Sequence, residues 1–133
     1  MAKTLEELVA YQLARKFKIE VYKLLQDHPE ATKDLKFWSQ LRDAARSSES
    51  NVAEGWKRYG LRQMAQFLRI SLASNEEAKG LVRDGIDSEY FTEPECEAAF
   101  ELGRRAGAAI HGLLMSIERL PPRQPKPPRT RKS

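Results

Sequence analysis

Apolar residues recur three and four positions apart along four long stretches of this chain, and no other feature of the sequence limits the fold as much. This spacing is the period of one face of an α-helix. The four stretches begin at Leu5, after Asp34, after Gly60 and after Thr92. No segment alternates apolar and polar residues between turn signals, as a half-buried strand does. The pattern predicts four amphipathic helices of about 22 to 28 residues. Because the connections are short, we expect an all-α fold, an antiparallel up-and-down four-helix bundle over residues 1–120.

Each predicted helix has one face that is expected to form the core. On the first helix this face is Leu5, Leu8, Val9, Leu13, Phe17, Val21, Leu24 and Leu25. On the second it is Leu35, Trp38, Leu41, Ala45, Ser48, Val52 and Gly55. On the third it is Leu61, Met64, Phe67, Leu68, Leu72, Asn75, Ala78, Leu81 and Val82. On the fourth it is Cys96, Phe100, Gly103, Ala106, Gly107, Ile110, Leu113, Leu114 and Ile117. The small residues of the second and fourth faces allow close helix crossing.

Three helix starts carry a capping signal. The sequences Thr4-Leu-Glu-Glu7 and Thr92-Glu-Pro-Glu95 have the spacing of a capping box, in which a Thr and a Glu exchange hydrogen bonds with each other's backbone amides. The first box predicts a helix that starts at Leu5. Asp34 is expected to cap the second helix.

The positive charge is concentrated at the C-terminus. The chain has 133 residues and a formal net charge of +4, yet residues 1–120 hold 18 basic and 19 acidic side chains. Residues 121–133 hold five cations, no acid and five of the seven prolines, so we expect a basic, extended tail outside the bundle. The bundle itself is polarised, with 12 basic and 7 acidic residues from Arg15 to Arg69 and 5 basic and 10 acidic residues from Ile70 to Leu120. The basic part is able to offer an anion-binding face, and solvated helix faces would give the same pattern.

The sequence predicts a cytoplasmic protein that does not enter a membrane. Its longest apolar-rich stretch, residues 106–117, is far shorter than the roughly 20 residues of a membrane span. The N-terminus carries Glu6 and Glu7 where a signal peptide has a basic start and an apolar run. The single cysteine, Cys96, is consistent with a reducing compartment.

Motifs of catalysis and cofactor binding are missing from the sequence. Neither His28 nor His111 has a Glu three positions before it, so the Glu-x-x-His pairs of di-metal bundles are absent. One Cys and two His do not make a zinc set. The acids beside Cys96 oppose thiolate formation, so Cys96 is expected to be a packing residue. We therefore expect no metal, no cofactor and no enzymatic activity.

One polar segment inside the second helix needs an explanation beyond helix propensity. Residues 47–58 read Ser-Ser-Glu-Ser-Asn-Val-Ala-Glu-Gly-Trp-Lys-Arg, and many of these side chains compete with the helix backbone for hydrogen bonds. Asn51, Glu54 and Arg58 share one face, and Glu54 precedes Arg58 in the favourable order for an ion pair. Because Ala53 and Gly55 flank it, Glu54 has room to be buried, and a buried Glu54 would have to be paired. We interpret the three residues as a structural polar layer or a subunit contact, with a recognition site as the alternative.

At this segment the chain resembles a known family. Residues 50–55, Ser-Asn-Val-Ala-Glu-Gly, are followed by Arg58 and then by residues 66–77, Gln-Phe-Leu-Arg-Ile-Ser-Leu-Ala-Ser-Asn-Glu-Glu. This pattern is similar to that of the bacterial 23S rRNA intervening-sequence proteins, and the likeness extends over about residues 10–120. The resemblance implies an antiparallel four-helix bundle that assembles as a homopentamer without enzymatic activity. Related bundles, the accessory variability determinants of diversity-generating retroelements, are basic pentamers that bind a reverse transcriptase and nucleic acid.

Our leading hypothesis is a non-catalytic, ring-forming scaffold or accessory protein that contacts RNA or DNA through its phosphates. The candidate contacts are Arg42, Arg46, Lys57, Arg58, Arg62 and Arg69 in the bundle and Arg123, Lys126, Arg129, Arg131 and Lys132 in the tail. A protein partner such as a nucleic-acid enzyme is also expected. The alternative is a protein–protein interaction module with no nucleic-acid role. A third hypothesis, an enzyme that uses Glu54 as a buried acid or base, has least support.

Overall fold

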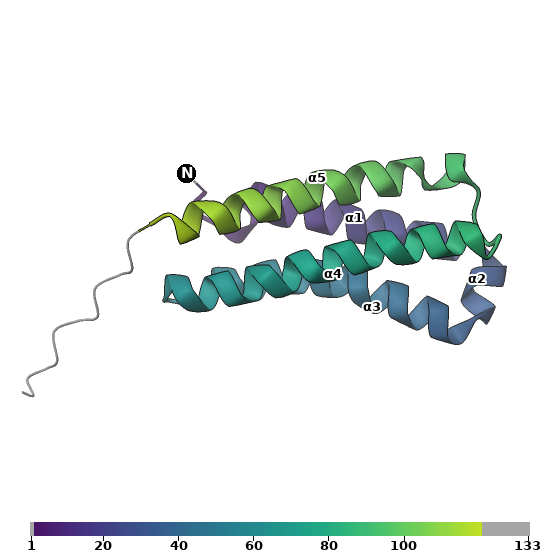
Figure 1. The fold of residues 1–133 in the computed structure, drawn as a ribbon, viewed down its shortest axis with the longest axis horizontal. Coiled ribbons are helices and arrows are strands. Elements are labelled where there is room, and N and C mark those ends of the chain that lie inside the picture. Colours follow the sequence, from purple (N-terminus) through teal and green to yellow (C-terminus); the bar gives the residue numbers. More distant parts are fainter. Residues whose placement is uncertain (1, 121–133) are drawn as a thin grey trace, which may run out of the picture.

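Four long α-helices lie side by side in the computed structural model, which describes residues 2–120 (Figure 1). They are α1 (Val9–Gln26), α3 (Leu35–Trp56), α4 (Leu61–Asp87) and α5 (Glu93–Glu118). A 3₁₀ turn, Leu5–Glu7, precedes α1, and a short helix, α2 (Pro29–Lys33), joins α1 to α3. The predicted all-α up-and-down bundle is confirmed, and the predicted basic tail, residues 121–133, lies outside the described residues.

The order of the helices gives the bundle two different ends. The N-terminus, the α3–α4 connection and the end of α5 lie at one end, and α2 lies at the other (Figure 1). We call the first the tail end, because residues 121–133 follow Leu120 there, and the second the α2 end. None of the helices in the described part of the chain is long and apolar enough to cross a membrane.

The helix starts follow the capping signals in two cases of three. Asp34 accepts a hydrogen bond from the Phe37 amide at 3.1 Å, and Thr92 forms a complete capping box with Glu95. The box predicted at Thr4 is wrong, because the Thr4 side chain makes no cap and Glu7 accepts from the Lys3 amide instead. The first α-helix therefore begins at Val9 and not at Leu5.

Two predicted core residues are also wrong. Val9 is 57% exposed and Leu35 is 72% exposed, because both lie in the first turn of a helix, before the bundle closes around it. Phe37 takes the place expected for Leu35 and is buried. The short helix α2 was not predicted; it turns the chain between α1 and α3 and buries Ala31.

A polar layer divides the core into two apolar clusters. The cluster at the α2 end is built around Phe17, Val21, Leu41 and Val82, and the cluster at the tail end around Ala14, Val52, Leu68 and Ile110. Between them, the fully buried side chains of Ser48, Ser71 and Asn75 lie at the level of the glycines Gly103 and Gly107 of α5.

Glycine is required where the chain enters the loop after α4. A Cβ at Gly85 would overlap the ring of Phe91 and lie 2.9 Å from Cζ of Phe37. Both rings are buried and packed against each other, with centroids 5.9 Å apart, so they have little room to move.

We expect Gly85→Ala to destabilise the fold by about 1–3 kcal/mol through this overlap. Gly80→Ala, five residues earlier on the same helix, is the matched control, since nothing lies within 4 Å of its Cβ position. This control should gain about 0.5–1 kcal/mol from helix propensity. Denaturant unfolding at fixed protein concentration measures both; equal effects from the two variants would contradict the packing described here.

His28 joins the end of α1 to the start of α5. Its Nδ1 lies 2.7 Å from the carbonyl oxygen of Leu24, and its Nε2 lies 3.0 Å from a carboxylate oxygen of Glu95. Both partners are acceptors, so both ring nitrogens donate, which requires the protonated imidazole. Burial of the ring opposes its protonation, but the hydrogen bonds to Leu24 and Glu95 and the nearby charge of Asp27 outweigh burial and raise the pKa of His28 above 6.5.

Because the pKa of His28 is higher in the folded chain than in the unfolded chain, its contribution to stability is complete below about pH 6.5. This contribution is lost as the pH rises through the raised value. We expect the free energy of unfolding to fall as the pH rises over this range. In His28→Gln, the free energy of unfolding should depend less steeply on pH. His111→Gln is the control, because His111 is exposed on α5. A slope unchanged by His28→Gln would exclude this role.

Candidate nucleic-acid interface

Cations from three helix ends meet at the tail end. Lys57 and Arg58 follow α3, Arg62 and Arg69 lie on the first turns of α4, and Arg119 follows α5. Residues 2–8, 54–69 and 117–120, which form this end, contain six Lys or Arg and four Glu. The chain continues from here into residues 121–133, which add five cations and no acid.

The α2 end has the opposite charge. Residues 23–36 and 83–97, which form it, contain nine Asp or Glu and four Lys or Arg. The two ends of one narrow bundle therefore differ in net charge, and a polyanion is attracted more strongly to the tail end than to the acidic segments of the α2 end.

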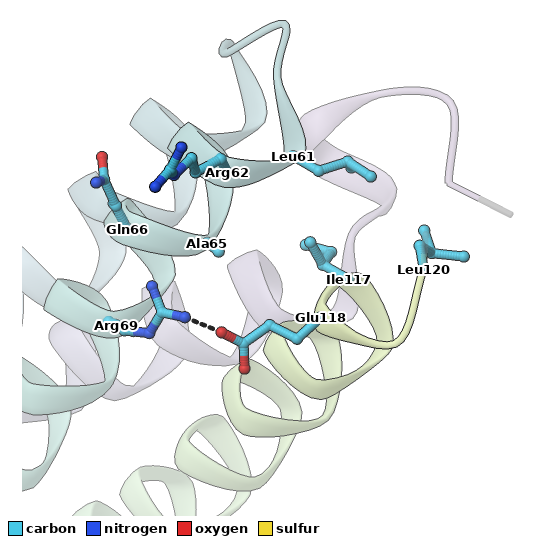
Figure 2. Close-up of a pocket in the computed structure, with 8 residues that line it drawn as sticks. All are labelled: Leu61, Arg62, Ala65, Gln66, Arg69, Ile117, Glu118 and Leu120. Atoms are coloured by element: carbon cyan, nitrogen blue, oxygen red, sulfur yellow. Dashed lines mark ion pairs between the residues drawn. The ribbon is translucent and has the colours of Figure 1, made fainter. Parts of the chain in front are cut away.

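A groove of about 700 Å³ opens at the tail end between α4 and α5. Figure 2 shows Arg62, Gln66 and Arg69 on the α4 side of the groove and, on the other side, Ile117 of α5 and Leu120, which follows α5. Its remaining lining residues are Leu61, Ala65 and Glu118. Arg69 and Glu118 form an ion pair across the groove, so the cation on α4 that stays without a carboxylate partner in the described chain is Arg62.

The predicted basic residues of the bundle fall into two groups. Lys57, Arg58, Arg62 and Arg69 are brought together at the tail end, and all four are exposed. Arg42 lies in the first half of α3 and Arg46 at its middle, away from that group.

Ion pairs and ring contacts occupy several of these cations. Arg46 pairs with Asp43 at 3.2 Å, and Arg58 pairs with Glu54 at 2.5 Å. The guanidinium of Arg58 also lies over the ring of Phe67, 4.7 Å from its centre. The predicted tail cations Arg123, Lys126, Arg129, Arg131 and Lys132 lie outside the described residues.

The polar layer is not built from the residues that the sequence suggested. Glu54 and Arg58 do pair, but the side chain of Glu54 is 40% exposed, so Glu54 is not the buried acid that its small neighbours would allow. Asn51 donates to the carbonyl and hydroxyl oxygens of Ser47 in its own helix, both at 2.9 Å. The small neighbours of Glu54 do not bury it, because it lies on the side of α3 that faces away from the core.

Instead, hydrogen bonds between helices converge on Asn75. The Asn75 amide donates to the Gly103 carbonyl at 2.9 Å, and its side-chain oxygen accepts from Ser48 at 3.4 Å. Ser71 donates to the Ser48 carbonyl at 2.6 Å, and the Ser47 and Ser74 hydroxyls are 2.8 Å apart. All buried side-chain N and O atoms of the described residues have a partner. This layer joins α3, α4 and α5.

The buried acid of the layer is Glu49, which the sequence pattern did not single out. Its side chain is 9% exposed and forms ion pairs with Arg15, at 3.3 Å, and with Lys18, both from α1. The signal in the sequence is weak, because the two cations are more than thirty positions away. Glu49 thus extends the polar layer to the fourth helix.

The remaining reactive groups are held in unreactive surroundings. Burial, followed by the charges of Glu95 and Glu93, raises the pKa of Cys96 to about 11, so its thiol stays protonated. Cys96 is fully buried, which fits the expected packing role, although the sequence left its exposure open. Among residues 2–120, no group of three or more His, Cys, Asp or Glu side chains is placed to hold a metal ion.

The fold and the charge distribution together define the class of protein: it is an all-α up-and-down bundle with a cationic end and a buried polar layer. The chain matches the 23S rRNA-intervening sequence protein family over residues 6–112 and belongs to that family. It is similar to a crystal structure of a protein of unknown function from the S23 ribosomal protein family of Bacteroides thetaiotaomicron. That likeness has a TM-score of 0.68 and 19% sequence identity, covers 84% of this chain and 100% of the other, and concerns the fold alone. No curated protein matches the chain.

We expect Asn75→Ala to lower the free energy of unfolding by about 1–2 kcal/mol, because it removes two buried hydrogen bonds between helices. Asn51→Ala is the control: its bonds stay within one helix, so stability should remain within about 0.5 kcal/mol of the wild type. Denaturant unfolding measures both variants. An equal cost at the two positions would show that the layer has no special role.

Proposed function

We propose that this protein is a non-catalytic accessory or scaffold bundle that assembles into a homo-oligomeric ring, a pentamer, and binds RNA or DNA through the tail end. The observation that supports nucleic-acid binding most is the gathering of cations from α3, α4 and α5 beside the start of residues 121–133. Neither Lys57 nor Arg62 has a carboxylate within ion-pair distance among the described residues, so both are free to contact phosphates.

Assembly would strengthen this binding. A ring of five chains carries five tails with five cations each, so contacts that are weak one at a time add up on a long polyanion. Contacts of this kind read phosphate charge and not base sequence. They weaken steeply with salt, because binding releases counterions.

A second candidate function is a protein-interaction module, and the groove between α4 and α5 favours it. Its apolar part, Leu61, Ala65, Ile117 and Leu120, is suited to a helix or an extended peptide of a partner protein. If the partner is a nucleic-acid enzyme, the bundle could have both candidate functions at once.

We expect replacement of Lys57 and Arg62 by glutamine to weaken binding to a mixed RNA and DNA pool at low salt. The slope of log affinity against log salt should shrink by about 0.7 for each single-strand phosphate that the variant no longer neutralises. Arg104 and Arg105, both exposed in the middle of α5, are the matched control pair and should change neither quantity when replaced by glutamine.

Glutamine replacement of the five tail cations in the full-length chain should reduce binding further, with light scattering showing an unchanged pentamer. Absence of all binding at low salt would exclude the nucleic-acid function. Loss of a co-purifying protein, and not of nucleic acid, would favour the interaction module. A monomer in solution would contradict the proposed ring.

A further inference from the structure

Two aromatic rings and an arginine border a hollow among α1, α2 and α3, in the half of the bundle nearer the α2 end. Tyr22 and Trp38 are half-buried, and the guanidinium carbon of Arg42 lies 4.3 Å from the centre of the Tyr22 ring and 5.5 Å from that of Trp38. The ammonium of Lys18 lies 5.7 Å from the same Tyr22 ring. The hollow measures about 260 Å³, and we call it the Tyr22 hollow. Its lining residues are Tyr22, Leu25, Gln26, Thr32, Trp38 and Arg42.

No carboxylate lines the Tyr22 hollow, and none lies within ion-pair distance of Arg42 in residues 2–120. Beside it, Arg15 and Lys18 share a single carboxylate, that of Glu49. This surface therefore keeps an excess of positive charge. By contrast, acidic side chains line two other hollows, one around His28 and one on the surface of α5.

These groups suit an unpaired nucleobase with its phosphate. Aromatic rings and the flat face of a guanidinium are the surfaces on which single-stranded bases stack. The edge of the Arg42 guanidinium still has N–H donors for a phosphate oxygen. The amide of Gln26, in the wall of the hollow, has a donor and an acceptor for a base edge. A volume of about 260 Å³ is below the range of common small-molecule sites, and it admits one flat ring.

We propose that the Tyr22 hollow receives an unpaired base of a single-stranded nucleic acid while Arg42 holds an adjacent phosphate. The proposal rests on the proposed function and makes it more specific: the preferred ligand is single-stranded, because the bases of a duplex are stacked on each other and do not reach the hollow. Arg42 and Lys57 are about 22 Å apart along α3 by helical rise, so one strand of several nucleotides contacts both the hollow and the tail end.

The test uses the full-length chain with Trp56→Phe, which leaves Trp38 as the single tryptophan. The probes are an unstructured oligouridine and an oligodeoxythymidine of about 12 nucleotides, within the usual range of single-strand site sizes, and a duplex of equal length. Trp38 fluorescence should be quenched by both single strands and not by the duplex. The two single strands distinguish RNA from DNA as the tighter ligand.

Two variants remove the stacking surface. Arg42→Lys keeps the charge and loses the flat guanidinium, and Tyr22→Leu keeps the apolar bulk and loses the ring. Each should bind single strands roughly tenfold more weakly, the cost expected when one base no longer stacks, with duplex affinity unchanged. Arg105→Lys, at an exposed position on α5, is the matched control and should change neither affinity. If Tyr22→Leu does not fold, Arg42→Lys alone decides.

This proposal would be overturned if single strand and duplex bound with equal affinity and neither changed the fluorescence of Trp38. If glutamines at Lys57 and Arg62 still weakened that binding, the proposed function would stand without the Tyr22 hollow. No binding of any probe at low salt would reject both. A changed oligomer size in Arg42→Lys would mark the hollow as a subunit contact and also overturn the proposal.

Discussion

One polar layer, halfway along the bundle, constrains all four long helices at once. Asn75 connects α4 to α3 and α5, and Glu49 connects α3 to two cations of α1. The glycines of α5 leave room for this: a Cβ at Gly107 would lie 3.0 Å from the Asn75 amide nitrogen. Apolar side chains tolerate a small slide of one helix along another, but a buried amide that loses its partner costs about 1–3 kcal/mol. The layer therefore favours one register over its neighbours.

The register decides where the charges lie. One apolar cluster fills the tail half of the bundle, and the other fills the α2 half. With the helices held in this alignment, the end of α3, the start of α4 and the end of α5 bring their cations together, and the acids collect around α2. If one helix slid along its neighbours by one turn, its charged groups would shift by about 5 Å relative to those of the other helices. The buried layer and the exposed charge pattern are thus parts of one arrangement.

Periodicity predicted the helices and most of their buried faces, including Asn75, because the apolar face of a helix can be identified from that helix alone. It failed in the first helical turns, as at Val9 and Leu35, where no neighbouring helix covers the face. Contacts between helices could not be predicted from the sequence. The pairing of Glu49 with Arg15 and the stacking of Arg42 on Tyr22 depend on how the helices are rotated relative to each other. The positive charge of the tail end could be predicted only in part, because its cations come from segments that are far apart in the sequence.

Amide hydrogen exchange, with and without a single-stranded oligonucleotide at low salt, tests the central claim that the cationic surfaces of this bundle bind a strand and that its acidic loop does not. We expect slower exchange near Lys57, near Arg62 and around the Tyr22 hollow, with no change in the loop that contains Glu89. Protection of the acidic loop around Glu89, or equal protection over the whole bundle, would contradict this claim.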